Sequence, residues 1–425
     1  MTTEAQVVIG ASYGDEGKGH MVDRLAAEAR GEATVIRFNS SAQAGHTVVT
    51  PDGRRHVFHH VGAGAFTGAT TMLSRYFMLH PMLLGEELRT LADVKLHPRL
   101  YADRRAPVAV PYDVLINQIA EEARGPRRHG SCGIGYNEAV ERSLRPRFAL
   151  DLDDLRDRRA LRTRLRAIRD HWVPRRLDVL GLEVPEDERG DLLRGDELIR
   201  RWLFDAEALL EALDPLNPGQ RPPGRPIFEG AQGLLLDQEG DDYPHVTRSR
   251  TGLANVIRIA QETDIEELEV SYVSRAYLTR HGAGPLPRPL PKAPDGIRDD
   301  TNLANRFQGA LRFAWLDADD LGRRLQRDLD VRAAGIRVRA GLAVTCLDQL
   351  SEFPFWRNGR LETGNEEEFL AALQDATGLP VTWCGRGAER AALERRAVAA
   401  SPPFRIPTRP APAPPKLAVC NGVRR

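Results

Sequence analysis

Residues 6–19, QVVIGASYGDEGKG, join a short β-branched run to a glycine-rich turn and the beginning of an amphipathic segment. The run 6–10 is typical of a buried strand, and the glycines that follow it indicate a tight turn. Apolar positions at helical spacing predict a helix over residues 18–28. A strand, a glycine turn and a helix in this order present backbone N–H groups to an anion. The segment therefore predicts an α/β unit with a P-loop-like phosphate loop.

The rest of the chain alternates between strand and helix signals. This alternation favours an α/β fold with a mostly parallel central sheet flanked by helices. The 425 residues predict a single large domain over 1–400 and a proline-rich, disordered tail over 401–425. Further strands are expected at 34–38, 108–110, 227–228, 268–277 and 341–346, and the last of these is the last strong strand predicted in the chain. A helix is expected at 114–123, and loops at 214–226 and 282–299.

Composition narrows the class of protein. Lys+Arg and Asp+Glu number 60 each, so net charge gives no general attraction to nucleic acid or to membranes. Basic residues in 151–175 interleave with acidic ones, which favours a solvated helix face over a nucleic-acid patch. The four cysteines are scattered without a CxxC pair, and no signal peptide or membrane span is visible. We expect a reduced, cytoplasmic protein.

The glycine turn departs from the common phosphate loop of nucleotide hydrolases. Ser12 stands where the first glycine would fall, and Gly19 stands where a Ser or Thr would bind magnesium. The turn carries a carboxylate, Asp15, which repels phosphates unless a metal bridges them or the carboxylate acts as a base. Lys18 would add a positive charge to a bound phosphate. Taken alone, the segment also fits a glycine turn with surface charges.

Several further motifs follow in order up to about residue 350. They are GDEGKG at 14–19, AGHT at 44–47, FEGAQG at 228–233, YP and VT within 243–247, TRHGAGP at 279–285 and WLD at 315–317. Together they resemble the adenylosuccinate synthetase family. The resemblance implies that family's fold, a GTP-dependent and Mg²⁺-assisted ligase activity, and the joining of L-aspartate to inosine monophosphate.

The family's chemistry implies roles for three residues. The enzyme phosphorylates the six-position oxygen of the purine with GTP, and the amine of aspartate then displaces phosphate. Asp15 would take the ring proton and bind the metal, His46 would stabilise the transferred phosphoryl group, and Gly45 would offer the metal a backbone carbonyl. Phage relatives replace the loop aspartate by serine, whereas this chain keeps it. Other residues implied in GTP or phosphate binding are Gly14, Glu16, Gly17, Lys18, Gly19 and Thr47.

The resemblance also implies residues that contact the nucleotide monophosphate. Gln43, Gln232 and Thr247 match family positions, and Ser131 replaces a threonine hydroxyl. Arg142 aligns with an arginine that reaches the phosphate in the partner subunit, with Arg145 as a competing candidate. This match implies a homodimer with shared active sites.

Residues 345–348 (TCLD) resemble the family's TKLD at the end of a strand. A carboxylate there accepts two hydrogen bonds from guanine that adenine does not offer, so Asp348 would select GTP. The alternative interpretation of Asp348 is a helix cap. Gly385 matches a later glycine that lines the guanine.

The amino-acid site is where the resemblance fails. The family's TTGR pattern before WLD is absent, although Thr301, Arg306 and Arg312 remain candidates to hold the amine donor's carboxylates. Two alternatives stay open. One is a paralogue with the same activation chemistry but another amino acid or purine-like nucleotide. The other is a non-catalytic guanine-nucleotide-binding protein, against which the retained Asp15 and His46 count.

Overall fold

The computed structural model describes residues 3–297, 299, 309–331 and 335–397. Its centre is a 10-stranded sheet with the order β16-β15-β12-β9-β1-β8-β2-β5-β6-β7. Every pairing in it is parallel except that of β15 with β16. The strands are β1 Glu4–Gly10, β2 Ala33–Arg37, β5 Thr70–Leu73, β6 Leu100–Asp103, β7 Leu213–Leu216, β8 Arg225–Gly233, β9 Glu267–Arg275, β12 Arg337–Thr345, β15 Val381–Gly385 and β16 Leu393–Arg395.

Two smaller sheets stand beside the central one. A 4-stranded sheet has the order β10-β11-β13-β14, and a hairpin joins β3 to β4. Their strands are β3 His46–Val49, β4 Arg55–Phe58, β10 Tyr277–Arg280, β11 Arg312–Asp317, β13 Phe353–Arg357 and β14 Arg360–Gly364. The hairpin begins at the candidate catalytic histidine, so this residue is fixed by strand pairing.

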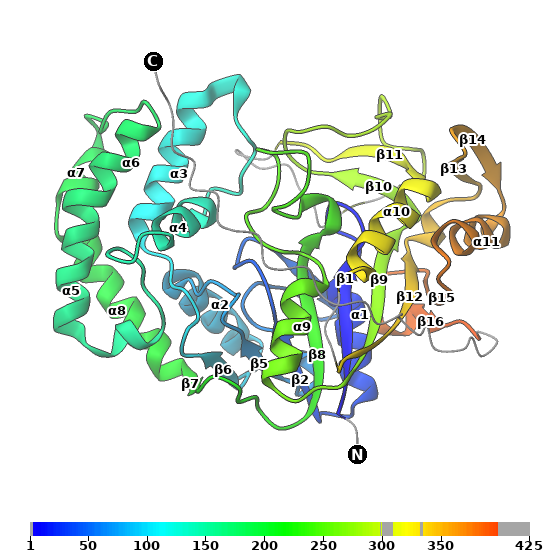
Figure 1. Ribbon diagram of the computed structural model, residues 1–425, viewed down its shortest axis with the longest axis horizontal. Helices are drawn as coiled ribbons and strands as arrows, with labels where there is room; N and C mark the ends of the chain where they lie inside the picture. The colour runs from blue at the N-terminus through cyan, green and yellow to red at the C-terminus, as the bar shows by residue number, and fades with distance from the viewer. Residues whose placement is uncertain (1–2, 298, 300–308, 332–334, 398–425) are drawn as a thin grey trace.

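Helices cover the sheet and extend beyond it. Figure 1 shows α5 to α8 gathered at one side of the molecule, with α10 and α11 on the other side near β13 and β14. The helices are α1 Lys18–Glu28, α2 Pro81–Asp93, α3 Pro111–Arg124, α4 Tyr136–Ser143, α5 Arg158–Ala167, α6 Val173–Val179, α7 Glu188–Arg194, α8 Glu197–Ala212, α9 Leu253–Glu262, α10 Ala318–Leu329 and α11 Glu366–Thr377. A π-helical turn, Ile168–Trp172, joins α5 to α6.

The predicted α/β class and mostly parallel sheet are confirmed, while three local predictions need correction. Within residues 108–110 only Val108 forms an isolated bridge, with Leu79, because prolines at 107 and 111 remove ladder donors on both sides. The expected loop 214–226 contains the edge strand β7, where a proline is tolerated because one side is unpaired. Sheet strands also continue after residue 346, in β15 and β16.

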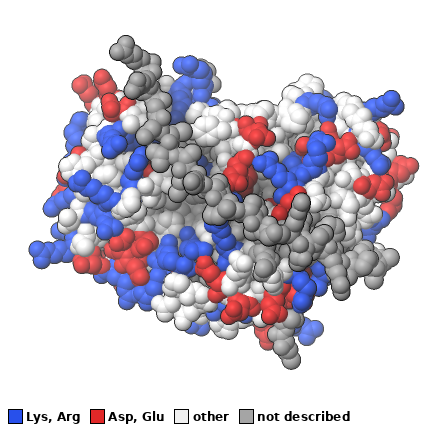
Figure 2. Space-filling view, in the orientation of Figure 1, with Lys and Arg blue, Asp and Glu red and all other residues white. Residues whose placement is uncertain are grey.

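Charge on the visible face is mixed. Figure 2 shows Lys and Arg interspersed with Asp and Glu rather than gathered by sign, in keeping with the balanced composition. The described helices are too short or too polar to cross a lipid bilayer. The predicted tail, 401–425, lies outside the described residues.

Candidate active site

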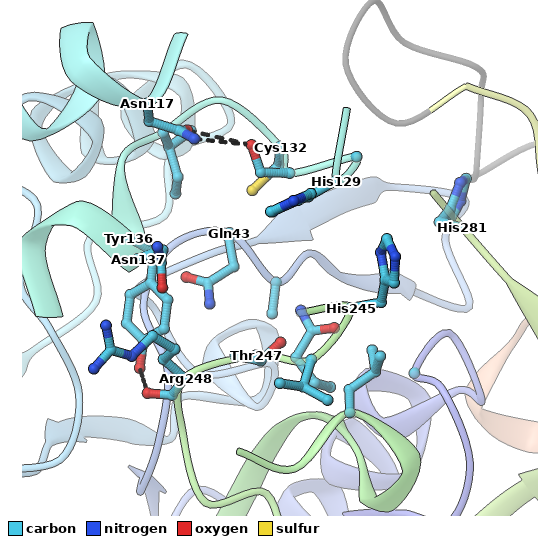
Figure 3. A pocket seen from close by; sticks show the side chains of 18 of the residues that line it. Gln43, Asn117, His129, Cys132, Tyr136, Asn137, His245, Thr247, Arg248 and His281 are labelled. Atoms are coloured by element: carbon cyan, nitrogen blue, oxygen red, sulfur yellow. Dashed lines mark hydrogen bonds between the residues drawn. The ribbon is translucent and has the colours of Figure 1, made fainter. Parts of the chain in front are cut away.

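A cavity of about 600 Å³ opens at the carboxyl ends of β1 and β8. In open parallel sheets, ligands bind at this edge, in the crevice beyond the strand ends. Figure 3 shows Gln43 and Thr247 in the middle of the cavity, with His281 towards one end and Tyr136, Asn137 and Arg248 at the other. The phosphate loop and His46 also line it, so the sequence-predicted catalytic residues meet in one place.

The phosphate loop is held together by Glu16. One carboxylate oxygen of this buried residue accepts hydrogen bonds from the N–H groups of Ser12, at 2.8 Å, and Gly14, at 3.0 Å. The other oxygen lies 2.9 Å from Nζ of Lys18, whose side chain is 4% exposed. Because the Glu16 side chain faces the loop interior, only its main chain is placed to meet a phosphate. Gly14 and Gly17 have φ of +94° and +91°, a conformation that favours glycine.

Asp15 stands on the cavity side of the same loop. Its side chain is 32% exposed, and Oδ2 lies 3.9 Å from Nε2 of His281. Burial raises the pKa of Asp15, and the nearby charges of His281, Arg275 and Lys18 oppose that shift. A carboxyl with a raised pKa holds a proton more readily than an ordinary aspartate, which suits a general base.

His46 is paired with a glutamate. Its Nδ1 lies 2.6 Å from Oε1 of Glu229, and the two side chains are 4% and 0% exposed. Burial lowers the pKa of His46 to about 4, against the opposing effect of Glu229. Burial alone would raise the pKa of Glu229, but its interactions with His46 and Arg37 lower it overall. We assign an ionised Glu229 that accepts a hydrogen bond from Nδ1–H of neutral His46.

The other ring nitrogen of His46 is available to a ligand. Nε2 is buried and has no hydrogen-bond partner among the described residues, and His46 lines the cavity. A buried polar atom without a partner costs free energy, which a hydrogen bond to substrate would recover. An anionic phosphoryl group in front of the ring and a carboxylate behind it both favour the protonated imidazole. The protonated imidazole of His46 can therefore donate a hydrogen bond from Nε2–H to negative charge that develops on the substrate.

The predicted metal donors fit magnesium only if the phosphates of a bound nucleotide supply further ligands. Asp15 offers one carboxylate and Gly45 one carbonyl, and the described residues hold no cluster of three His, Cys, Asp or Glu placed to bind a metal. Mg²⁺ commonly takes one or two carboxylates and completes its shell with waters and substrate phosphates. A side chain at Gly45 would put Cβ 2.7 Å from Cγ1 of Val57, so the close approach here requires glycine.

The residues assigned to the nucleotide monophosphate surround the same cavity. Gln43, Ser131, Gln232 and Thr247 all line it. The Ser131 hydroxyl lies 3.0 Å from Nδ2 of Asn117, and Oε1 of Gln43 is buried without a partner among the described residues. These polar groups are available to orient a purine nucleotide.

Arg142 does not have the position predicted for it. Its guanidinium is 0% exposed and paired with Asp113, also 0% exposed, at 2.9 Å. Its remaining donors reach the carbonyls of Phe148, at 2.7 Å, and Val108, at 2.8 Å. Every nitrogen is therefore used inside the subunit, and this geometry leaves Arg142 no free donor for the predicted contact with a partner's phosphate. The competing candidate, Arg145, is exposed just after α4 and outside the cavity.

The guanine candidates lie around the end of β12. Asp348 is exposed in the short turn after this strand, and the turn has no side-chain cap, so the helix-cap interpretation is not supported. Thr345 donates from Oγ1 to the carbonyl of Glu16 at 2.8 Å, which ties the strand end to the phosphate loop. A Cβ on Gly385 would lie 3.4 Å from Thr345, so Gly385 also borders the loop.

The amino-acid candidates are only partly described. Thr301 and Arg306 lie outside the described residues. Arg312 begins β11 and donates from Nη2 to the carbonyls of Gly282, at 2.7 Å, and Gly284, at 2.9 Å. It therefore supports the turn that carries His281 towards the cavity.

Sequence reasoning missed three residues of this site. Glu229 and Arg37 set the charge around His46, and His281 faces Asp15. Glu229 lies within the FEGAQG motif, so the motif held a signal for it. Nothing in the sequence pairs residues 46 and 229, because they meet only when the chain folds and the start of β3 lies against the middle of β8.

Comparison with known proteins agrees with this geometry. A model of the adenylosuccinate synthetase family matches residues 7–354. The adenylosuccinate synthetases of Xanthomonas axonopodis pv. citri (strain 306) and Xylella fastidiosa (strain M12) are each 30% identical, with matches covering 82% of this chain and 78% of the relative.

Two solved structures share the fold. The fully ligated adenylosuccinate synthetase of Plasmodium falciparum has a TM-score of 0.69 at 19% identity, over 92% of this chain and 100% of that one. The cyanophage S-2L succinoaminodeoxyadenylate synthetase, bound to dGMP and dATP, has a TM-score of 0.57 at 18% identity, over 93% and 96%.

The fold and the site thus define a class of protein: an α/β enzyme with a phosphate loop, and with an aspartate and a histidine suited to acid–base chemistry in the cavity at its strand ends. The chain belongs to the adenylosuccinate synthetase family, whose members are GTP-dependent ligases of purine biosynthesis. The predicted family, fold class and enzyme class are confirmed, and the non-catalytic alternative is not supported.

Proposed function

We propose that this protein joins the amine of L-aspartate to the six position of inosine monophosphate, using GTP and Mg²⁺. The observation that carries the proposal is that Asp15 and His46 line the same cavity, with Glu229 paired to the histidine. The purine oxygen becomes nucleophilic only when the neighbouring ring nitrogen loses its proton, and these are the groups that step requires.

The proposed activation step divides between the two residues. Asp15 removes the ring proton, and the six-oxygen attacks the γ-phosphorus of GTP while the bond to the bridging oxygen breaks and GDP leaves. His46 donates from Nε2 to the transferred phosphoryl group. Mg²⁺, held by Asp15, the Gly45 carbonyl and the nucleotide phosphates, would neutralise charge on GTP. The amine then attacks C6, and inorganic phosphate leaves.

Guanine selection is assigned to Asp348. The cyanophage structure that shares this fold was solved with dATP, so the fold alone does not decide between the two bases. In this chain, an exposed carboxylate follows the strand whose end contacts the phosphate loop. Its two oxygens would accept hydrogen bonds from the ring N–H and amino group of guanine. A homodimer remains part of the proposal, although not through Arg142.

A second candidate function concerns the amine donor. The sequence lacks the family's TTGR pattern at residues 300–314, and that difference favours a paralogue that accepts another amino acid. The activation step would be unchanged, because it depends on Asp15 and His46 at the other side of the purine.

The test separates activation from amine transfer. Purified protein is incubated with GTP, Mg²⁺ and inosine monophosphate without amino acid, and isotope exchange between the bridging and non-bridging oxygens of GTP is followed. Exchange that depends on the nucleotide and disappears in Asp15→Asn supports the activation step. A panel of amino acids, assayed by phosphate release and product mass, then identifies the donor. Absence of exchange in a folded wild type that binds GTP would overturn the proposal.

A further inference from the structure

The cavity has two ends, and the acceptor nucleotide has two ends as well. The six-oxygen of a purine nucleotide and its 5′-phosphate lie at opposite ends of the molecule. If the six-oxygen lies at Asp15 and His46, the base extends past Gln43 and Thr247, in the middle of the cavity in Figure 3. The phosphate then falls at the end formed by Tyr136, Asn137 and Arg248.

Three of the arginines that line the cavity were not predicted from the sequence. Arg176 and Arg248 belong to the phosphate end, because their partners lie on α4, the helix that also carries Tyr136 and Asn137. Each of the three is held in place by a glutamate rather than left free. The pairs are Arg124 with Glu121, Arg176 with Glu138, and Arg248 with Glu141. An arginine fixed by a carboxylate keeps its remaining N–H groups in a defined direction, and planar N–H pairs match phosphate oxygens well.

Arg176 is the best placed of the three. Its Nε lies 2.6 Å and its Nη2 3.1 Å from the two oxygens of Glu138, a bidentate clamp. The side chains are 13% and 3% exposed, so the pair is anchored inside the cavity wall. Nη1 has no acceptor among the described residues. The clamp therefore leaves one nitrogen of a well-oriented guanidinium for a ligand.

Within the proposed function, on which this inference rests, we propose that Arg176, oriented by Glu138 and assisted by Arg248, binds the 5′-phosphate of the acceptor nucleotide within the same subunit. The arginine that the family resemblance assigned to a partner's phosphate, Arg142, is consumed by Asp113 and two carbonyls. The subunit supplies its own replacement from α6, a helix that the sequence resemblance did not connect to the site.

The first experiment compares a nucleotide with its nucleoside. Binding of inosine monophosphate and of inosine is measured by calorimetry for wild type, Arg176→Gln and Arg176→Lys. Loss of a charge-assisted hydrogen bond should raise the Kd of the monophosphate by about 10- to 100-fold in Arg176→Gln and leave that of inosine within about 3-fold. Arg176→Lys should recover part of the loss, because it keeps the charge without the bidentate clamp.

Arg175→Gln is the matched control. Arg175 is the neighbour of Arg176 on α6, is exposed and does not line the cavity, so both affinities should stay at wild-type values. Thermal unfolding of each variant, together with Arg176→Gln/Glu138→Gln, which removes both charges, separates lost contact from lost folding. Equal affinity of wild type for inosine and its monophosphate, or equal loss of both ligands in Arg176→Gln, would overturn the inference.

A mixing experiment tests whether the contact lies within one subunit. Arg176→Gln and Asp15→Asn proteins are mixed under conditions of confirmed subunit exchange and assayed for phosphate release. Both residues act on the same cavity, so hybrids should recover no activity; recovery would place Arg176 in the partner's site and refute the proposal. If wild type itself shows no nucleotide-dependent turnover but binds the monophosphate through Arg176, the proposed function fails and the binding site stands.

Discussion

Glu229→Gln is the substitution that bears most directly on the chemistry. It keeps the size of the side chain and removes the charge behind His46. The hydrogen bond is 2.6 Å long between side chains that are 4% and 0% exposed, so solvent does not screen it. A charge-assisted bond of this kind contributes about 1.5–3 kcal/mol, and the imidazolium needs it most in the transition state. We expect kcat to fall by about 10- to 150-fold.

The assay must separate catalysis from folding. Arg37 lies 3.8 Å from Glu229 and would lose a partner in the variant, so stability should fall as well. Phosphate release at saturating GTP and acceptor is therefore divided by the folded fraction measured under the same conditions. KM for GTP should change little, because Glu229 lies behind the histidine.

The decisive comparison is a double variant. If Glu229 acts only through His46, adding Glu229→Gln to His46→Asn should cost little further activity per folded molecule. Glu229→Asp keeps the charge at a shorter reach and should lie between wild type and Glu229→Gln. An equal loss of rate from Glu229→Gln with and without His46 would refute the assignment of a His46–Glu229 pair.

Four other substitutions have definite expectations. Asp15→Asn should retain GTP binding in a titration and lose more than about 100- to 10,000-fold in phosphate release. Asp348→Asn should raise KM for GTP by about 30- to 150-fold and leave that for ATP unchanged, measured by steady-state kinetics. Burial raises the pKa of Asp328 to about 6, so its ionised form destabilises the fold; Asp328→Asn should gain at most about 3 kcal/mol in denaturant unfolding at pH 8 and nothing below about pH 4. Arg142→Leu should lose about 3–5 kcal/mol, and Arg142→Leu/Asp113→Leu should regain part of it.

Local patterns predicted the first unit of the fold with accuracy. The helix expected at 18–28 is α1 with the same bounds, and the strand expected at 6–10 lies inside β1. Strand order could not be predicted in the same way. β1 pairs with β8 and β9, more than 200 residues away, and periodicity within a segment carries no information on its partner. The edge strand β7 was missed because its proline, Pro215, suits a loop as well as an unpaired edge.

The site was predictable where a residue acts through its own chemistry, and not where it acts through a neighbour. Asp15 and His46 stand in motifs whose residue types suit proton transfer, and both line the cavity. Arg142 has a residue type that suits phosphate, but the buried carboxylate of Asp113 determines what it does. The sequence shows where an arginine stands but not which carboxylate pairs with it. The ligand of a basic residue therefore cannot be predicted from its residue type alone.

The cavity places chemistry and recognition on separate elements. Asp15, His46 and Glu229 come from the loop after β1, the start of β3 and the middle of β8, all fixed by the central sheet or its hairpin. The proposed phosphate site comes from α4 and α6, which pack outside the sheet, and we propose that the amine donor binds near the described part of the β10–β11 connection that lines the cavity. An enzyme that used another acceptor nucleotide would therefore be expected to differ at the Arg176–Glu138 pair. One that used another amine donor would be expected to differ in the β10–β11 connection. Neither difference would disturb the hydrogen bond that orients His46, so activation chemistry can persist in this fold while its substrates differ.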